Sequence, residues 1–294
     1  QKRYTFSERS WRISAIITET METQILCSTG TMVGRANGYD YHVIIENRNA
    51  VEADGFELMM LKAWYDKLPE VADALDKAGV ATPTIHFEKD VGALLSLGSE
   101  EDRREGLRLF TMNADMAKAV GAGKAVFHLW DGRFSEAQLA GALSLLDALY
   151  EICDKRGVRL AVENVPCRKP TPLENLLSIA RMFPQAGFTF DTRHASYMAQ
   201  CGAFFESEIW EPRICHLHVS DYSGETVPGM WGVTRPILHP GDGIIDFETL
   251  FAKMPAYHGG TVTLESPVLA ENGGLDLPKL NRSLAYLSEK MKKR

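Results

Sequence analysis

The segment AVFHLWDGRFSEAQLAGALSLLDALYEICDKRGVRLAVENV, residues 125–165, holds the repeating unit that decides the fold. It begins with the apolar run 125–129 and ends with a second, largely apolar run, 160–165, and runs of this length are typical of buried strands. Between them, apolar residues recur at the spacing of one helix face, at Leu139, Leu143, Leu146, Leu149 and Cys153. The segment therefore predicts a strand, a helix and a second strand.

Boundary residues support this helix. Ser135 with Gln138 has the form of a capping box at its start, and Gly157 follows a cationic last turn at its end. Three other segments carry helical patterns of their own, at 68–77, 100–121 and 278–293.

Eight strand-like runs follow one another along the chain, with helical patterns between them. They are 25–28, 55–60, 84–87, 125–129, 160–165, 188–191, 214–219 and 261–265. Strands that alternate with helices pair in parallel through right-handed crossovers. An open doubly wound sheet is the alternative, but its dinucleotide-binding form has a GxGxxG turn after the first strand, and Gly30 opens no such turn. The predicted fold class is α/β, a single (β/α)8 TIM barrel.

Composition restricts the class of protein. The 294 residues carry 32 Lys or Arg and 39 Asp or Glu, a net charge of −7, and 45% are hydrophobic. This predicts a folded core and argues against general nucleic-acid or anionic-membrane binding. We assign residues 21–294 to the barrel and residues 1–20 to an N-terminal extension or flexible arm. No run is long enough for a membrane span or a secretory signal, so we expect a cytoplasmic protein.

Ionisable residues gather in and at the ends of the strand-like runs. The carboxyl ends of barrel strands line one mouth of the barrel, so these side chains are expected at one rim. Burying them without partners would be costly, and a divalent cation would remove that cost for the carboxylates. Carboxylates with one imidazole suit Mn²⁺, Mg²⁺, Co²⁺ or Zn²⁺. The residues are Glu57, His86, His128, Glu163, Asp191, His216, His218 and Glu265.

Strand parity separates the two histidines of the seventh run. His216 and His218 are two residues apart, so both should face the same side of the sheet. His218 lies nearer the carboxyl end of the strand and is the better candidate ligand. His216 is expected in a lower layer or behind the ligands.

Several motifs, in their order along the chain, resemble the sugar phosphate isomerase/epimerase family of xylose isomerase-like TIM barrels. The resemblance spans about residues 24 to 290 and is specific for the superfamily rather than for a substrate. The motifs are Val162-Glu163-Asn164-Val165-Pro166, Phe190-Asp191-Thr192-Arg193-His194-Ala195, His218-Val219-Ser220-Asp221, the segment 239–247, and Leu264-Glu265-Ser266-Pro267.

The resemblance implies one divalent metal ion, Mn, Zn, Co or Mg, held by Glu163, Asp191, His218 and Glu265. It also implies that Glu163 and Glu265 are the catalytic acid and base. They would move a proton next to a carbonyl group through a cis-enediolate, which gives isomerisation or epimerisation of a sugar or a related hydroxy-carbonyl compound.

Further residues are expected to contact this sugar-like substrate. The resemblance assigns His194 to substrate hydroxyls, and Arg235 stands in the loop 223–238, which we predict to be a lid or part of an oligomer contact. The full set of predicted substrate-binding residues is His194, His86, His128, Arg235, His239 and Trp130. A homodimer or homotetramer is compatible with the sequence.

Three alternative functions remain. The chain partly resembles endonuclease IV, a zinc-dependent DNA-repair enzyme, because His86, His128 and His194 match its zinc ligands. The Asp-Arg-His triplet of that family is absent at 235–237, however, and no basic run is present to bind a duplex. A dehydratase or lyase on the same scaffold and a non-catalytic sugar- or metal-binding protein are the other two.

Overall fold

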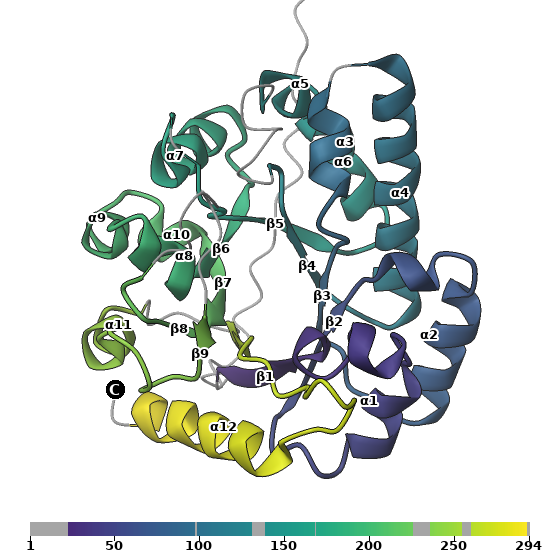
Figure 1. Cartoon of the computed structure of the whole chain (residues 1–294). Coiled ribbons are helices and arrows are strands. Elements are labelled where there is room, and N and C mark those ends of the chain that lie inside the picture. Colours follow the sequence, from purple (N-terminus) through teal and green to yellow (C-terminus); the bar gives the residue numbers. More distant parts are fainter. Residues whose placement is uncertain are drawn as a thin grey trace, which may run out of the picture.

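Eight parallel strands close into a barrel that helices surround (Figure 1). The computed structural model describes residues 23–97, 99–130, 139–167, 169–225, 236–254 and 260–292. Around the barrel the strands follow the order β1-β10-β7-β6-β5-β4-β3-β2, so each pairs with its neighbour in the chain and the last pairs with the first. The predicted single (β/α)8 barrel is confirmed.

All eight predicted runs are strands, with ends within two residues of those expected. The barrel strands are β1 Gln24–Ser28, β2 Gly55–Met59, β3 Thr84–His86, β4 Lys124–Phe127, β5 Arg159–Glu163, β6 Gly187–Asp191, β7 Ile214–Val219 and β10 Thr261–Leu264. A separate antiparallel pair is formed by β8 Asp221–Tyr222 and β9 Ile237–Leu238.

The predicted helices at 68–77, 100–121 and 278–293 correspond to α2, α4 and α12. The described helices are α1 His42–Asn47, α2 Leu68–Lys77, α3 Val91–Leu97, α4 Glu100–Ala119, α5 Leu139–Leu143, α6 Leu146–Asp154, α7 Pro172–Met182, α8 Thr192–Tyr197, α9 Cys201–Phe205, α10 Trp210–Arg213, α11 Phe247–Lys253 and α12 Leu277–Lys292. None of them is long and apolar enough to cross a membrane.

One prediction is corrected: the helical pattern from Leu139 to Cys153 forms two helices, α5 and α6, rather than one. The break falls at Ser144 and Leu145. The Ser144 hydroxyl donates to the carbonyl of Gly141 at 2.7 Å, a local bond that competes with the helix. Apolar periodicity continues through this break because Leu139 of α5 and Leu146 and Leu149 of α6 are all buried. The predicted capping box at Ser135 and the extension 1–20 lie outside the described residues.

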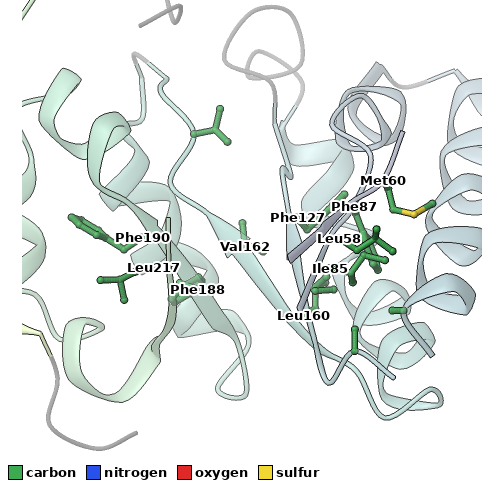
Figure 2. Packing of buried hydrophobic residues seen from close by; sticks show 14 of the residues in the cluster. Leu58, Met60, Ile85, Phe87, Phe127, Leu160, Val162, Phe188, Phe190 and Leu217 are labelled. Atoms are coloured by element: carbon green, nitrogen blue, oxygen red, sulfur yellow. The ribbon is translucent and has the colours of Figure 1, made fainter. Parts of the chain in front are cut away.

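The strands divide their side chains between two environments. Apolar residues such as Leu58, Ile85 and Phe190 belong to the core between strands and helices, and Figure 2 shows them against the helices on opposite sides of the barrel. The alternate residues lie on the other face of the strands, where β2 and β7 contribute Glu57 and His218, both fully buried. The barrel interior is therefore polar, which places the ionisable groups together.

Asp221 organises the turn that follows the strand pair β8–β9. Its carboxylate accepts the backbone N–H groups of Tyr222, Gly241, Gly243 and Ile245 at 2.8 to 3.1 Å. A Cβ atom on Gly243 would lie 2.5 Å from Asp221 Oδ1, so only glycine fits there. Asp221, the last residue of the motif that begins at His218, thus stabilises the Gly241-Asp242-Gly243 turn.

Candidate metal and catalytic centre

Glu163 occupies the centre of the site. It ends β5 and is 1% exposed. Its carboxylate lies 2.8 Å from Nε2 of His128, which forms a hydrogen bond, and 3.5 Å from Nε2 of His86. Nδ1 of His194 and Nδ1 of His218 lie 3.3 and 3.4 Å from its other oxygen. Histidines from β3, β7, α8 and the segment that follows β4 thus surround one buried carboxylate.

The four predicted metal ligands lie together at this point. Nδ1 of His218 is 3.4 Å from an oxygen of Glu163 and 3.4 Å from an oxygen of Glu265. Asp191, His218 and Glu265 each offer one ligand atom, and these atoms lie within 4.8 Å of one another, as do those of Glu163, Asp191 and His194. Their spacing suits a single cation.

Three buried polar atoms without hydrogen-bond partners indicate whether a cation fits this centre. Asp191 Oδ2, His194 Nδ1 and His218 Nδ1 are buried, and no group in the described part of the chain forms a hydrogen bond with them. Burying such atoms without partners is costly. A divalent ion bound by Asp191 and His218 would satisfy the carboxylate oxygen and the imidazole nitrogen of these two predicted ligands, so the residues fit the predicted metal.

Local hydrogen bonds fix the position of Asp191. The residue ends β6 and caps α8, because its Oδ1 accepts the backbone N–H of His194 at 2.6 Å. The side chain of Asn164 accepts the N–H of Asp191 at 2.6 Å and donates to its carbonyl at 3.2 Å. The other carboxylate oxygen of Asp191 remains available to the centre. Asn164 belongs to the motif that begins at Val162, but this positioning role was not predicted from the sequence.

Glu57 is the residue whose importance was missed. It lies on β2, is 0% exposed, and contacts both histidines of β7. Nε2 of His216 is 2.8 Å from Oε2 of Glu57, and Nε2 of His218 is 3.0 Å from Oε1, off the line of a regular hydrogen bond. The shared face predicted for His216 and His218 is confirmed. The position of Glu57 within a strand-like run was visible in the sequence, but its partners were not.

Burial and neighbouring charge act in opposite directions on the buried acids and bases. Burial disfavours ionised Glu163, but the electrostatic interactions of its carboxylate with His128 and His218 outweigh burial and hold the pKa of Glu163 well below its usual range. The same balance holds for Glu57. The effect of burial is outweighed by the interactions with His218 and His216, and the pKa of Glu57 is also well below its usual range. Burial lowers the pKa of His128 and of His216 to about 4. The two glutamates are therefore ionised near neutral pH.

Two predicted substrate-binding residues have structural partners instead of open surroundings. Trp130 is fully buried and donates from Nε1 to the carbonyl of Val165 at 2.7 Å. His239 pairs through Nδ1 with the Ser283 hydroxyl at 2.7 Å. Their contact with substrate stays a prediction, as it does for His86, His128 and His194. Arg235 and most of the predicted lid 223–238 lie outside the described residues.

A cavity of about 750 Å³ opens beside Glu265. Its wall combines apolar side chains, including Met59 and Val33, with charged ones. Lys62 pairs there with Asp90. The lining residues are Ser28, Gly30, Val33, Tyr39, Met59, Met60, Leu61, Lys62, Ala63, Glu88, Lys89, Asp90, Arg193, Ile237, Glu265 and Pro267. A cavity that joins apolar walls to a few polar groups can hold a small polar molecule against the centre.

Comparison with known proteins agrees with this architecture. The family model described as Xylose isomerase-like TIM barrel matches residues 46–288. No curated protein matches the chain.

Solved structures resemble the whole barrel at low sequence identity. An L-ribulose 3-epimerase is 14% identical with a TM-score of 0.72, covering 92% of this chain and 95% of its own. A D-allulose 3-epimerase from Methylomonas sp., solved with D-allulose, is 14% identical with a TM-score of 0.71, covering 91% and 97%. The IOLI protein, solved with a zinc atom, is 13% identical with a TM-score of 0.71, covering 92% and 99%. At these identities the likeness is one of fold.

Proposed function

This chain belongs to the xylose isomerase-like TIM barrel family, and on that premise we propose that it is a divalent-metal-dependent epimerase or isomerase of a sugar or a related hydroxy-carbonyl compound. One observation carries the proposal: Nδ1 of His218 lies 3.4 Å from oxygens of both Glu163 and Glu265, with a ligand atom of Asp191 beside it. The printed names of two similar structures, an L-ribulose and a D-allulose 3-epimerase, support the substrate class.

Glu163, Asp191, His218 and Glu265 would hold the cation. When bound, the cation supplies positive charge that stabilises an oxyanion on the substrate. Zinc in the structure of the similar IOLI protein supports zinc as one candidate metal, beside Mn, Co and Mg.

The two glutamates do the proton transfer in this proposal. One carboxylate takes the proton from the carbon next to the carbonyl group, and the other carboxyl group returns a proton. Return to the opposite face of the same carbon is epimerisation, and return to the neighbouring carbon is isomerisation. Glu163 is kept ionised by its histidine partners, and His128 holds its Oε2. Glu265 borders the cavity, where substrate would lie.

Solvent deuterium exchange tests the proposal. The metal-loaded protein is incubated in D₂O with a panel of ketopentoses and ketohexoses, and deuterium at the α carbon is measured by NMR. Glu163→Gln and Glu265→Gln should each abolish exchange. The matched control is Glu248→Gln, an exposed glutamate that pairs with Lys290 on the outside of the barrel. Full exchange in either site variant contradicts a two-base mechanism.

A second candidate function rests on His86. Its Nδ1 contacts the carbonyl of Phe87 at 2.6 Å, so Nε2 is left as an acceptor facing Glu163, and His86, Glu163 and His218 form another candidate ligand group. More than one ion per chain would favour a zinc-dependent endonuclease of abasic DNA. Metal content by elemental mass spectrometry, followed by cleavage of an abasic-site duplex, separates the two candidates.

A further inference from the structure

A chain of polar contacts crosses the lower part of the barrel beneath the candidate centre. Lys124, the first residue of β4, donates from Nζ to the Thr261 hydroxyl at 2.8 Å and to the Cys215 carbonyl at 2.6 Å. Thr261 begins β10, and β4 and β10 stand on opposite sides of the closed barrel. The lysine side chain therefore spans the barrel interior.

The chain continues from Thr261 to the candidate metal ligand. Oγ1 of Thr261 is 2.5 Å from Nδ1 of His216, and Nε2 of His216 is 2.8 Å from Oε2 of Glu57. The other oxygen of Glu57 is 3.0 Å from Nε2 of His218. Three side chains thus link Lys124 to His218, and two of them, Thr261 and His216, are cross-strand neighbours in the sheet register.

The polarity of these contacts is determined at both ends. An ionised Glu57 can only accept, so Nε2 of His216 and Nε2 of His218 must each carry a proton. A neutral His216 then has no proton on Nδ1, which accepts from the Thr261 hydroxyl. Lys124 donates to the Thr261 oxygen, so the hydroxyl proton is directed to His216. Each contact in the chain then joins a donor to an acceptor, with the contact between His218 and Glu57 off the line of a regular hydrogen bond.

We propose that Glu57, held by the chain Lys124–Thr261–His216, is a positioning residue that keeps the proton of His218 on Nε2 and leaves Nδ1 to bind the cation. The inference rests on the proposed function only in taking His218 as a ligand. Partners that hold the second nitrogen of a ligating histidine commonly set its tautomer and its orientation.

Glu57→Gln is the discriminating change, because the amide offers one acceptor and one donor where the carboxylate offered two acceptors. One histidine must therefore move its proton to Nδ1. His216 is held by the Thr261 hydroxyl, so His218 is expected to change, and its proton then occupies the ligand position. Zinc affinity should fall by about 10- to 100-fold, the usual effect of losing such a partner.

A second substitution should partly reverse this loss. Thr261→Val removes the hydroxyl that holds His216 in its tautomer, so in the double variant with Glu57→Gln the proton change can move to His216. Zinc affinity should recover several-fold. Thr84→Val is the matched control, because Thr84 is also buried at a strand in the barrel and its hydroxyl has no hydrogen-bond partner among the described residues. In the same background it should recover nothing.

The experiment combines zinc titration with ¹⁵N NMR of the histidine rings. The Nε2–H signal of His218, identified by its absence in His218→Asn, should be present in the zinc-free wild type and absent in Glu57→Gln. Weaker zinc binding with that signal retained, equal recovery from Thr84→Val, or a wild-type His218 protonated on Nδ1 but not on Nε2 would each overturn the proposal. The last observation needs no variant to fold. If the wild type binds no zinc, the proposed function fails, while the NMR result still judges the tautomer.

Discussion

The side-chain amide of Asn164 brackets the backbone of Asp191, accepting its N–H at 2.6 Å and donating to its carbonyl at 3.2 Å. The pair joins the ends of β5 and β6, so it fixes the separation between Glu163, which precedes Asn164, and the carboxylate of Asp191. Two candidate ligands are thereby positioned by a residue that is not a ligand itself.

Replacing Asn164 by Ala should weaken both folding and metal binding. Two buried backbone groups of Asp191 lose their partner, which costs about 1–3 kcal/mol of unfolding free energy for an unsatisfied group. Urea denaturation measures that loss, and zinc titration should show weaker binding as Asp191 shifts. Asn272→Ala is the control: it also removes a side-chain acceptor, of the Gly274 N–H, but in an exposed turn away from the centre, so zinc affinity should not change. Unchanged zinc affinity in a destabilised Asn164→Ala would restrict this residue to a structural role.

Close packing between α3 and β4 gives a second prediction. A Cβ atom on Gly92 would lie 1.9 Å from the carbonyl oxygen of His128, so Gly92→Ala must displace the end of β4. Overpacking of this kind costs about 1–3 kcal/mol or more, and the hydrogen bond from His128 to Glu163 should lengthen. Thermal unfolding measures the cost. Gly202→Ala in α9 is the control, because nothing lies within 4 Å of its added methyl group, and it should be neutral or stabilising. Equal melting temperatures for the two variants would refute the packing argument.

The barrel strands and the rim residues were predictable because each depends on local sequence. Short apolar runs such as 214–219 predict strands from their own residues. Parallel pairing then brings the carboxyl ends of these strands to one rim, independently of the exact helix positions. Contacts across the barrel interior have no such signal. Glu57 was recognised as an ionisable residue within a strand, but its approach to His216 and His218 depends on the closed geometry of the barrel. The break at Ser144 was hidden for a related reason, since apolar spacing continues across it.

His239 gives a pH-dependent prediction for stability. Burial, aided by the charge of Lys279, lowers the pKa of His239 below its ordinary value. His239 therefore binds a proton more readily in the unfolded chain than in the folded protein. The contribution of neutral His239 to the free energy of unfolding is complete above about pH 6.5 and is lost as the pH falls below that value. The urea midpoint of the wild type should fall between pH 7 and pH 5 more steeply than that of His239→Gln. Parallel plots of urea midpoint against pH for the two proteins would contradict this prediction.

Metal removal should lower the stability of the fold itself, apart from any effect on activity. The candidate ligands come from β5, β6, β7 and the residue after β10, so a cation bound by them would connect four strands in the folded state alone. At a free metal concentration 100 times the dissociation constant, binding adds about 2.7 kcal/mol to the unfolding free energy. Zinc should therefore raise the melting temperature of the chelator-treated wild type. Asp191→Asn and Glu265→Gln should reduce that rise, whereas Glu248→Gln on α11 should keep it in full. An equal rise in all four proteins would place the bound zinc elsewhere and would contradict the assigned ligands.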